Sequence, residues 1–157
     1  MKYGKTFEEF EALNGISAED VMTVFDAVSQ AYPMIVLANL TQNTYTMIKD
    51  DGFLVGAVPM VGCYDDLIDF GVENVHPNYQ KSFVDHFSRE CLLYQFGQGK
   101  REVCTKLYQK GKGQQYQWVS THVIRVQDKD GDVCEICLNR ILENMQQSGE
   151  RIGREYY

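Results

Sequence analysis

The chain has 157 residues, which is enough for one domain with a sizeable hydrophobic core and short for two. Hydrophobic residues make up 44% of the chain and charged residues 24%, the balance of an ordinary globular protein, and this argues against intrinsic disorder. The 22 acidic residues outnumber the 15 Lys and Arg residues, and the net charge of -7 argues against sequence-independent binding to nucleic-acid backbones or anionic membranes.

The N-terminal region is predicted to be helical. A short helix is expected over residues 6–13, and Ser17 followed by Asp20 resembles a capping box that opens a second helix. The apolar face of this second helix comprises Val21, Val24, Phe25 and Val28. Because such a face needs a surface to cover, these four residues are candidates for a dimer interface.

Two strands and a looser region follow. Residues 34–40 are almost wholly apolar and residues 44–48 are rich in β-forming types, so the two segments are predicted to pair as an antiparallel hairpin. Glycines and prolines interrupt residues 49–75, where loops and short helices are expected, including one over 64–70.

Two firmer helices are predicted next. Pro77 is well placed in the first turn of a helix over residues 75–87, and Ser88 can cap another over 89–96.

Three long strands complete the predicted domain. The first covers residues 101–109, and the other two form a long hairpin over 114–141 whose turn contains Asp130-Gly131. Both faces of the first strand of this hairpin carry apolar side chains, so that strand is expected to be a central one, covered on both sides. The element order predicts an α+β domain with one antiparallel sheet and helices grouped mainly on one face.

The cysteines and histidines do not form a recognisable chemical site. Cys134 and Cys137 make a C-x-x-C pattern, but residues three apart on a strand point to opposite faces and cannot share a metal ion or form a disulfide. The three histidines are isolated, and an isolated histidine is more often a packed or surface residue than a haem ligand. The sequence therefore predicts no metal site and identifies no cofactor.

Catalytic motifs are also missing. The sequence contains no Gly-x-Ser-x-Gly nucleophile turn, no convincing carboxylate pair and no strand-to-helix glycine loop for phosphate. We therefore do not predict an enzyme.

Compartment is predicted from two further features. No apolar run approaches the roughly 20 residues of a membrane span, and the N-terminus lacks the basic-then-apolar order of a signal peptide. Five cysteines at irregular spacing fit reduced thiols better than a disulfide framework. Both features favour a cytoplasmic location.

Four segments in this order resemble the PAS domains of bacterial signalling proteins, over roughly residues 24–141. They are IVLANLTQNTYTMI, VHPNYQKSF, FSRECLLYQFGQGK and YQWVSTHVIRVQDKDGDVCEICLNRI. They are similar to the PAS variants that precede diguanylate cyclase modules in Firmicutes. On this resemblance residues 1–23 are an N-terminal helical extension and residues 142–157 an exit segment towards a further domain.

The resemblance implies a five-stranded antiparallel sheet in the order 2-1-5-4-3, with a ligand pocket between its inner face and the short helices. Candidate pocket residues are Asn39, Tyr45, Cys91, Tyr94, Trp118, Ser120 and His122. Because side chains alternate along a strand, a register shift of one residue would exchange the two faces of the sheet.

Three functions are compatible with these features. The first is a sensory domain that binds a small ligand or dimerises, and that regulates an output domain absent from this chain, with a diguanylate cyclase as the candidate. The second is a ligand-free interaction module that forms a homodimer. The third is a small cone-shaped α+β isomerase, for which His122 is the candidate buried catalytic group.

Overall fold

The computed structural model describes residues 8–9, 15–54, 56, 58–126 and 130–142. The helix predicted over residues 6–13 and the exit segment predicted over 142–157 lie almost entirely outside these residues.

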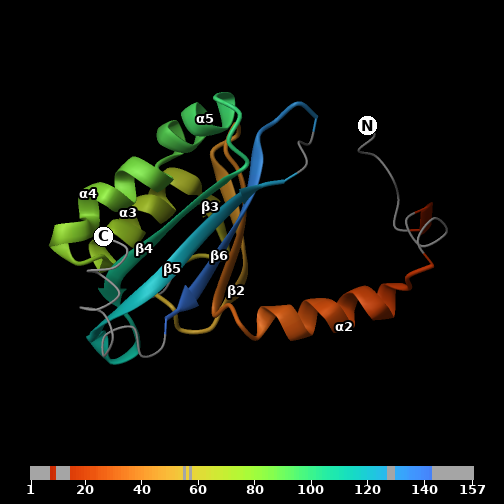
Figure 1. The fold of residues 1–157 in the computed structure, drawn as a ribbon, viewed down its shortest axis with the longest axis horizontal. Helices are drawn as coiled ribbons and strands as arrows, with labels where there is room; N and C mark the ends of the chain where they lie inside the picture. The colour runs from red at the N-terminus through yellow and green to blue at the C-terminus, as the bar shows by residue number, and fades with distance from the viewer. Residues whose placement is uncertain (1–7, 10–14, 55, 57, 127–129, 143–157) are drawn as a thin grey trace, which may run out of the picture.

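A six-stranded antiparallel sheet forms the body of the domain (Figure 1). Its strands are β1 (Met34–Asn39), β2 (Thr44–Asp50), β3 (Val61–Cys63), β4 (Glu102–Lys110), β5 (Tyr116–Arg125) and β6 (Cys134–Ile141). They lie in the order β3-β2-β1-β6-β5-β4. The five predicted strands are all present and pair in the predicted order.

The prediction of five strands is nevertheless wrong by one, because β3 adds a sixth strand at the edge of β2. Only three residues of β3 pair with β2, from Thr46 opposite Val61 to Thr44 opposite Cys63. So short a segment within a Gly- and Pro-rich region carries no periodic pattern. The segment becomes a strand because the edge of β2 offers backbone hydrogen-bonding groups, and its own sequence does not predict this.

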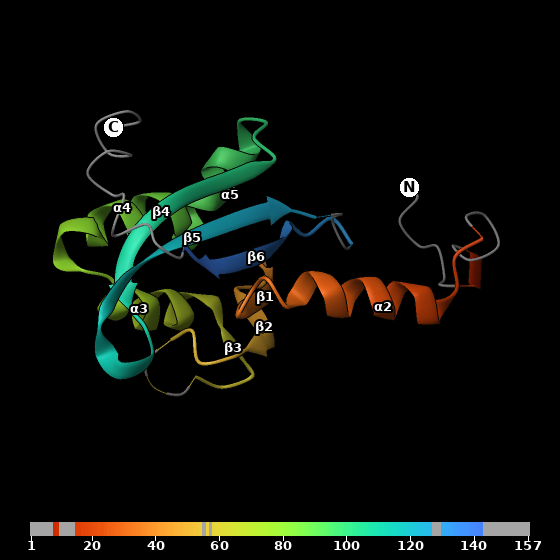
Figure 2. The ribbon, with the colours of Figure 1, turned by 60° about the horizontal axis from the view of Figure 1, so that its bottom comes forward.

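Three helices cover one face of the sheet, as predicted (Figures 1 and 2). They are α3 (Tyr64–Asn74), α4 (Pro77–Phe87) and α5 (Arg89–Gly97). Pro77 opens α4 as predicted, and the Ser88 hydroxyl caps α5 by accepting a hydrogen bond from the Cys91 N–H at 3.3 Å. A single 3-10 turn, η1 (Lys112–Gln114), lies between β4 and β5.

Helix α2 (Ala18–Ser29) extends away from the sheet and has no buried residue (Figure 2). The predicted capping box is present: the Ser17 hydroxyl accepts from the Asp20 N–H at 3.1 Å, and the Asp20 carboxylate accepts from the Ser17 N–H at 3.3 Å. The exposed fractions of Val24, Phe25 and Val28 are 62%, 39% and 50%. A dimer contact through this face remains a prediction.

Alternate residues of the long hairpin β5–β6 face the helices. On β5, the buried set is Val119, Thr121 and Val123, and the alternate residues lie on the outer face. The turn has positive φ at Asp130 (53°) and Gly131 (83°), as the Asp-Gly pair predicted.

None of the helices in the described residues has both the length and the apolar character needed to cross a bilayer.

Candidate functional site

A cavity of about 50 Å³ lies between the inner face of the sheet and helices α3 and α4. Its walls are mainly apolar. The helices and the segment before β3 contribute Phe53, Leu54, Leu67, Ile68, Phe83 and Phe87. The sheet contributes Met34, Val36, Val123 and Cys137. The pocket predicted between sheet and helices therefore has a counterpart in the structure.

Two polar residues of the cavity wall, Thr121 and Asn139, satisfy each other. They lie directly opposite on β5 and β6, and the Thr121 hydroxyl donates to the Asn139 side-chain oxygen at 3.0 Å. The Asn139 amide nitrogen donates in turn to the Met34 carbonyl at 3.4 Å. Their hydrogen-bonding capacity is thus largely used within the protein.

Gln109 is the third polar side chain of the wall and differs from the other two. It lies on β4, is only 3% exposed, and its amide forms no hydrogen bond with another described residue. This amide is available to a bound molecule.

Two further groups on the cavity wall are neutral. The Tyr64 hydroxyl donates to the Phe87 carbonyl at 2.8 Å, and burial raises the pKa of Tyr64 well above its ordinary value. Burial also raises the pKa of the Cys137 thiol, with a further contribution from the nearby Glu135 carboxyl. Both side chains therefore stay protonated at neutral pH.

Glu135 is a buried carboxyl that the sequence analysis did not single out. It is 0% exposed on the inner face of β6, two residues before Cys137, and neither carboxyl oxygen has a hydrogen-bond partner among the described residues. Burial raises the pKa of Glu135 to about 8, so it is mostly protonated at pH 7. It lies outside the set of residues that line the cavity.

None of the seven candidate pocket residues lines this cavity. Trp118, Ser120 and His122 alternate with the buried residues of β5 and are not on the cavity side of that strand. The Trp118 ring nevertheless contacts the ring of Tyr79 on α4, with 5.4 Å between the ring centroids. The His122 ring nitrogen Nε2 lies 2.6 Å from Glu102 Oε1 on β4. Tyr94 is 68% exposed on α5.

Two of the remaining three candidates, Tyr45 and Asn39, have side-chain hydrogen bonds. The buried Tyr45 donates its hydroxyl to the Pro59 carbonyl at 2.7 Å, and Asn39 donates to Asp132 at 3.0 Å. Both residues border an open surface depression of about 340 Å³ at the ends of β1 and β2. Cys91 is half-buried in the first turn of α5. Ligand binding by the seven residues remains a prediction that the structure does not support at the cavity.

Strand β6 shows why the inner face of the sheet could not be assigned from hydrophobicity. On β6 the more apolar alternate residues, Ile136 and Leu138, lie on the outer face, whereas Glu135 and Asn139 lie inside. Hydrophobicity alone therefore assigns the faces of β6 the wrong way round. The series Glu135, Cys137 and Asn139 could have been noticed as one polar face of a strand, but sequence pattern gave no reason to bury it.

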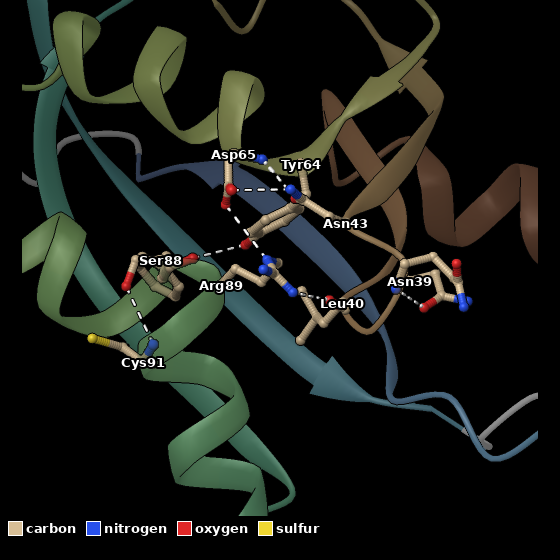
Figure 3. Close-up of polar contacts among 10 residues, drawn as sticks. Asn39, Leu40, Asn43, Tyr64, Asp65, Ser88, Arg89 and Cys91 are labelled. Carbon is tan, nitrogen blue, oxygen red and sulfur yellow. Dashed lines mark hydrogen bonds and ion pairs between the residues drawn. The ribbon is translucent and has the colours of Figure 1, made fainter.

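Arg89, the first residue of α5, contacts both the β1–β2 turn and the start of α3 (Figure 3). Its guanidinium donates to the Leu40 carbonyl at 2.9 Å and lies 3.7 Å from Asp65 at the start of α3. The Asn43 amide nitrogen also donates to Asp65, at 2.9 Å. These contacts join the β1–β2 turn to the starts of α3 and α5.

The described part of the chain contains no metal-binding cluster and no disulfide. No group of three or more His, Cys, Asp or Glu side chains is arranged to hold a metal ion there, and its five cysteines form no disulfide. Cys137 lines the cavity, and Cys134 lies three residues earlier on the same continuous strand. Strand alternation therefore directs the two thiols to opposite faces, as predicted.

These features define a PAS-like fold: a single antiparallel sheet with helices over one face and a cavity between the two layers. The chain is similar to the solved structure of a sensory box histidine kinase/response regulator from Burkholderia thailandensis E264. The TM-score is 0.55 and the identity 12%, and the match covers 82% of this chain and 92% of that one. No protein-family model and no curated protein sequence matches the chain significantly. At this identity the likeness establishes the fold alone.

Proposed function

We propose that the chain is a PAS-type sensory domain that binds a small molecule in the cavity between the sheet and helices α3 and α4. The observation that carries the proposal is the Gln109 side chain on β4, which is 3% exposed in the wall of a mainly apolar cavity and has no hydrogen bond to another described residue. Apolar walls with few convergent polar groups are typical of small-molecule sites. A ligand that pairs with Gln109 would use both the donor and the acceptor of that amide inside a mainly apolar cavity.

The connection from the cavity to α2 supports a signalling role. Met34, the first residue of β1, lines the cavity, and Pro33 precedes it at the end of the α2 connection. The Lys49 ammonium on β2 donates to the Ser29 carbonyl at the last turn of α2. A ligand that favours one placement of β1 would therefore bias the direction of α2, by no more than its difference in affinity for the two states.

Binding is favoured over catalysis. The isomerase alternative needs a carboxylate or histidine facing the cavity, but His122 lies on the outer face beside Glu102, and Glu135 is outside the cavity wall. We therefore propose a non-catalytic domain that regulates an output domain on a longer protein. A diguanylate cyclase is the candidate output from the sequence resemblance, and a histidine kinase is the one named in the similar structure.

Native mass spectrometry of the full chain tests the ligand proposal. The wild-type protein is expected to retain a small molecule, and Val123→Phe, which places a ring in the cavity, should lose it. The matched control is Val103→Phe, because Val103 is buried on the same sheet but does not line the cavity. A bare wild-type protein that also binds nothing from a host metabolite extract would refute a sensory ligand site.

A second function, a dimerisation or interaction module, is favoured by the exposed apolar face of α2. It predicts that the chain is a dimer by light scattering and that Phe25→Asp makes it monomeric. Thr23→Asp changes the opposite side of the same helix and should leave the dimer intact. A monomeric wild-type chain at high concentration would exclude self-association through α2.

A further inference from the structure

The chemical class of ligand can be read from the cavity wall, provided that the proposed ligand function holds. The backbone of Gln109 is fixed on both sides, because it pairs with Gln117 on β5 and forms a bridge with Val75. Its side-chain amide offers one acceptor oxygen and two donor hydrogens, and no described residue uses them. A ligand in the cavity therefore meets a donor and an acceptor side by side on one side chain, whose backbone is held in the sheet.

The other polar groups of the wall are engaged within the protein. Thr121 donates to Asn139, Asn139 donates to the Met34 carbonyl, and Tyr64 donates to the Phe87 carbonyl. Among the lining residues with an amide or hydroxyl side chain, Gln109 is thus the one whose side chain has no hydrogen bond to another described residue.

The cavity wall provides no charge to neutralise an ionised ligand. None of the described residues that line it is Asp, Glu, Lys, Arg or His. Glu135 on the neighbouring inner face is mostly uncharged at pH 7 and can become only negative. Removing an ion from water without a partner is far more costly than removing a neutral polar group, so anions are disfavoured strongly and cations have no counter-charge at neutral pH.

We infer that the cavity binds an uncharged ligand with an amide-like end, in which a carbonyl oxygen and an N–H lie side by side. The ligand carbonyl accepts a hydrogen bond from the Gln109 amide nitrogen, and the ligand N–H donates to the Gln109 amide oxygen. The apolar remainder of the ligand packs against residues such as Phe53, Leu67 and Phe83.

The size of the cavity limits the part of the ligand that fits without rearrangement. Its volume of about 50 Å³ is well below the roughly 150 Å³ of an engineered apolar cavity that holds benzene. A planar group of four heavy atoms is therefore the right size for a first probe, and a larger ligand requires the walls to move apart.

Three probes of equal size and shape separate the ligand classes. Acetamide is neutral, acetate is its anionic counterpart and acetamidinium its cationic one. Each is titrated into the full chain at pH 7, and binding is followed by the NMR shifts of methyl groups on cavity-lining side chains such as Leu67 and Val123. The variants are Gln109→Met, which keeps the side-chain length without the amide, and the control Gln117→Met, whose side chain lies opposite Gln109 but outside the cavity wall.

Acetamide is expected to bind saturably and more tightly than acetate or acetamidinium. Gln109→Met should weaken acetamide about five-fold or more, the effect of losing a net hydrogen bond, and Gln117→Met should leave it unchanged. Tighter binding of acetamidinium or acetate, an unchanged affinity in Gln109→Met, or no shift with acetamide would overturn the inference. If a host molecule is nevertheless retained in the cavity by native mass spectrometry, the sensory proposal stands and only the ligand class is wrong.

Discussion

Replacing Glu135 by Met is predicted to stabilise the domain by an amount that grows with pH. The Glu135 carboxyl is fully buried and its oxygens have no partner among the described residues. Met has a similar length, fills the same space and carries no group that needs a hydrogen bond. The variant therefore lacks the cost of burying an unpaired polar group at every pH. At high pH it also lacks the cost of ionising a buried carboxyl.

The effect of Glu135 on the free energy of unfolding depends on pH because its pKa is higher in the folded protein than in the unfolded chain. Burial raises the pKa of Glu135 from 4.5 to about 8, so the folded protein holds this proton more tightly than the unfolded chain does. The contribution to stability is complete below pH 4.5 and is lost as the pH rises towards 8. Each pH unit in this window removes about 1.4 kcal/mol, so about 3 kcal/mol is lost between pH 4.5 and pH 7. Removing the unsatisfied group adds about 1–3 kcal/mol at all pH values.

Urea unfolding of the wild type and the variant from pH 5 to 7.5 measures this difference. Other carboxyl groups titrate in both proteins, so the quantity to plot is the difference in the free energy of unfolding. It should widen by about 3 kcal/mol across the range. Glu73→Met, a change at an exposed position on α3, should follow the wild type. A difference that stays constant with pH would show that Glu135 is ionised or solvated in the folded protein.

Three further substitutions test the packing described above. Thr121→Val leaves the Asn139 side-chain oxygen buried without its donor. The free energy of unfolding, measured in urea, should fall by about 1–3 kcal/mol. An unchanged free energy would mean that this hydrogen bond does not stabilise the fold. Ser17→Ala removes the cap of α2 and should speed amide hydrogen exchange in α2 alone, because that helix has no buried residue; a fall in global stability would contradict this. Trp118→Ala should cost about 1–3 kcal/mol through its ring contacts with Tyr79 and Tyr108 and leave acetamide affinity unchanged, whereas weaker binding would place Trp118 at the ligand site.

The sequence by itself determined the elements whose causes are local. The capping box of Ser17 and Asp20 opens α2, Pro77 opens α4, and Asp130-Gly131 turns the β5–β6 hairpin. Each depends on conformational preferences of a few neighbouring residues. The order of five strands also followed, through the resemblance to PAS domains, and the structure shows it with one strand added.

Tertiary structure decided which face of each strand became the interior. Alternation divides β5 and β6 into two sets of side chains, but only the helices packed above them choose between the sets. They cover the set that contains Thr121, Glu135 and Asn139, and leave the more apolar Ile136 and Leu138 outside. The cavity and the unpaired Gln109 amide follow from that choice, since both are made by contacts between residues far apart in the chain.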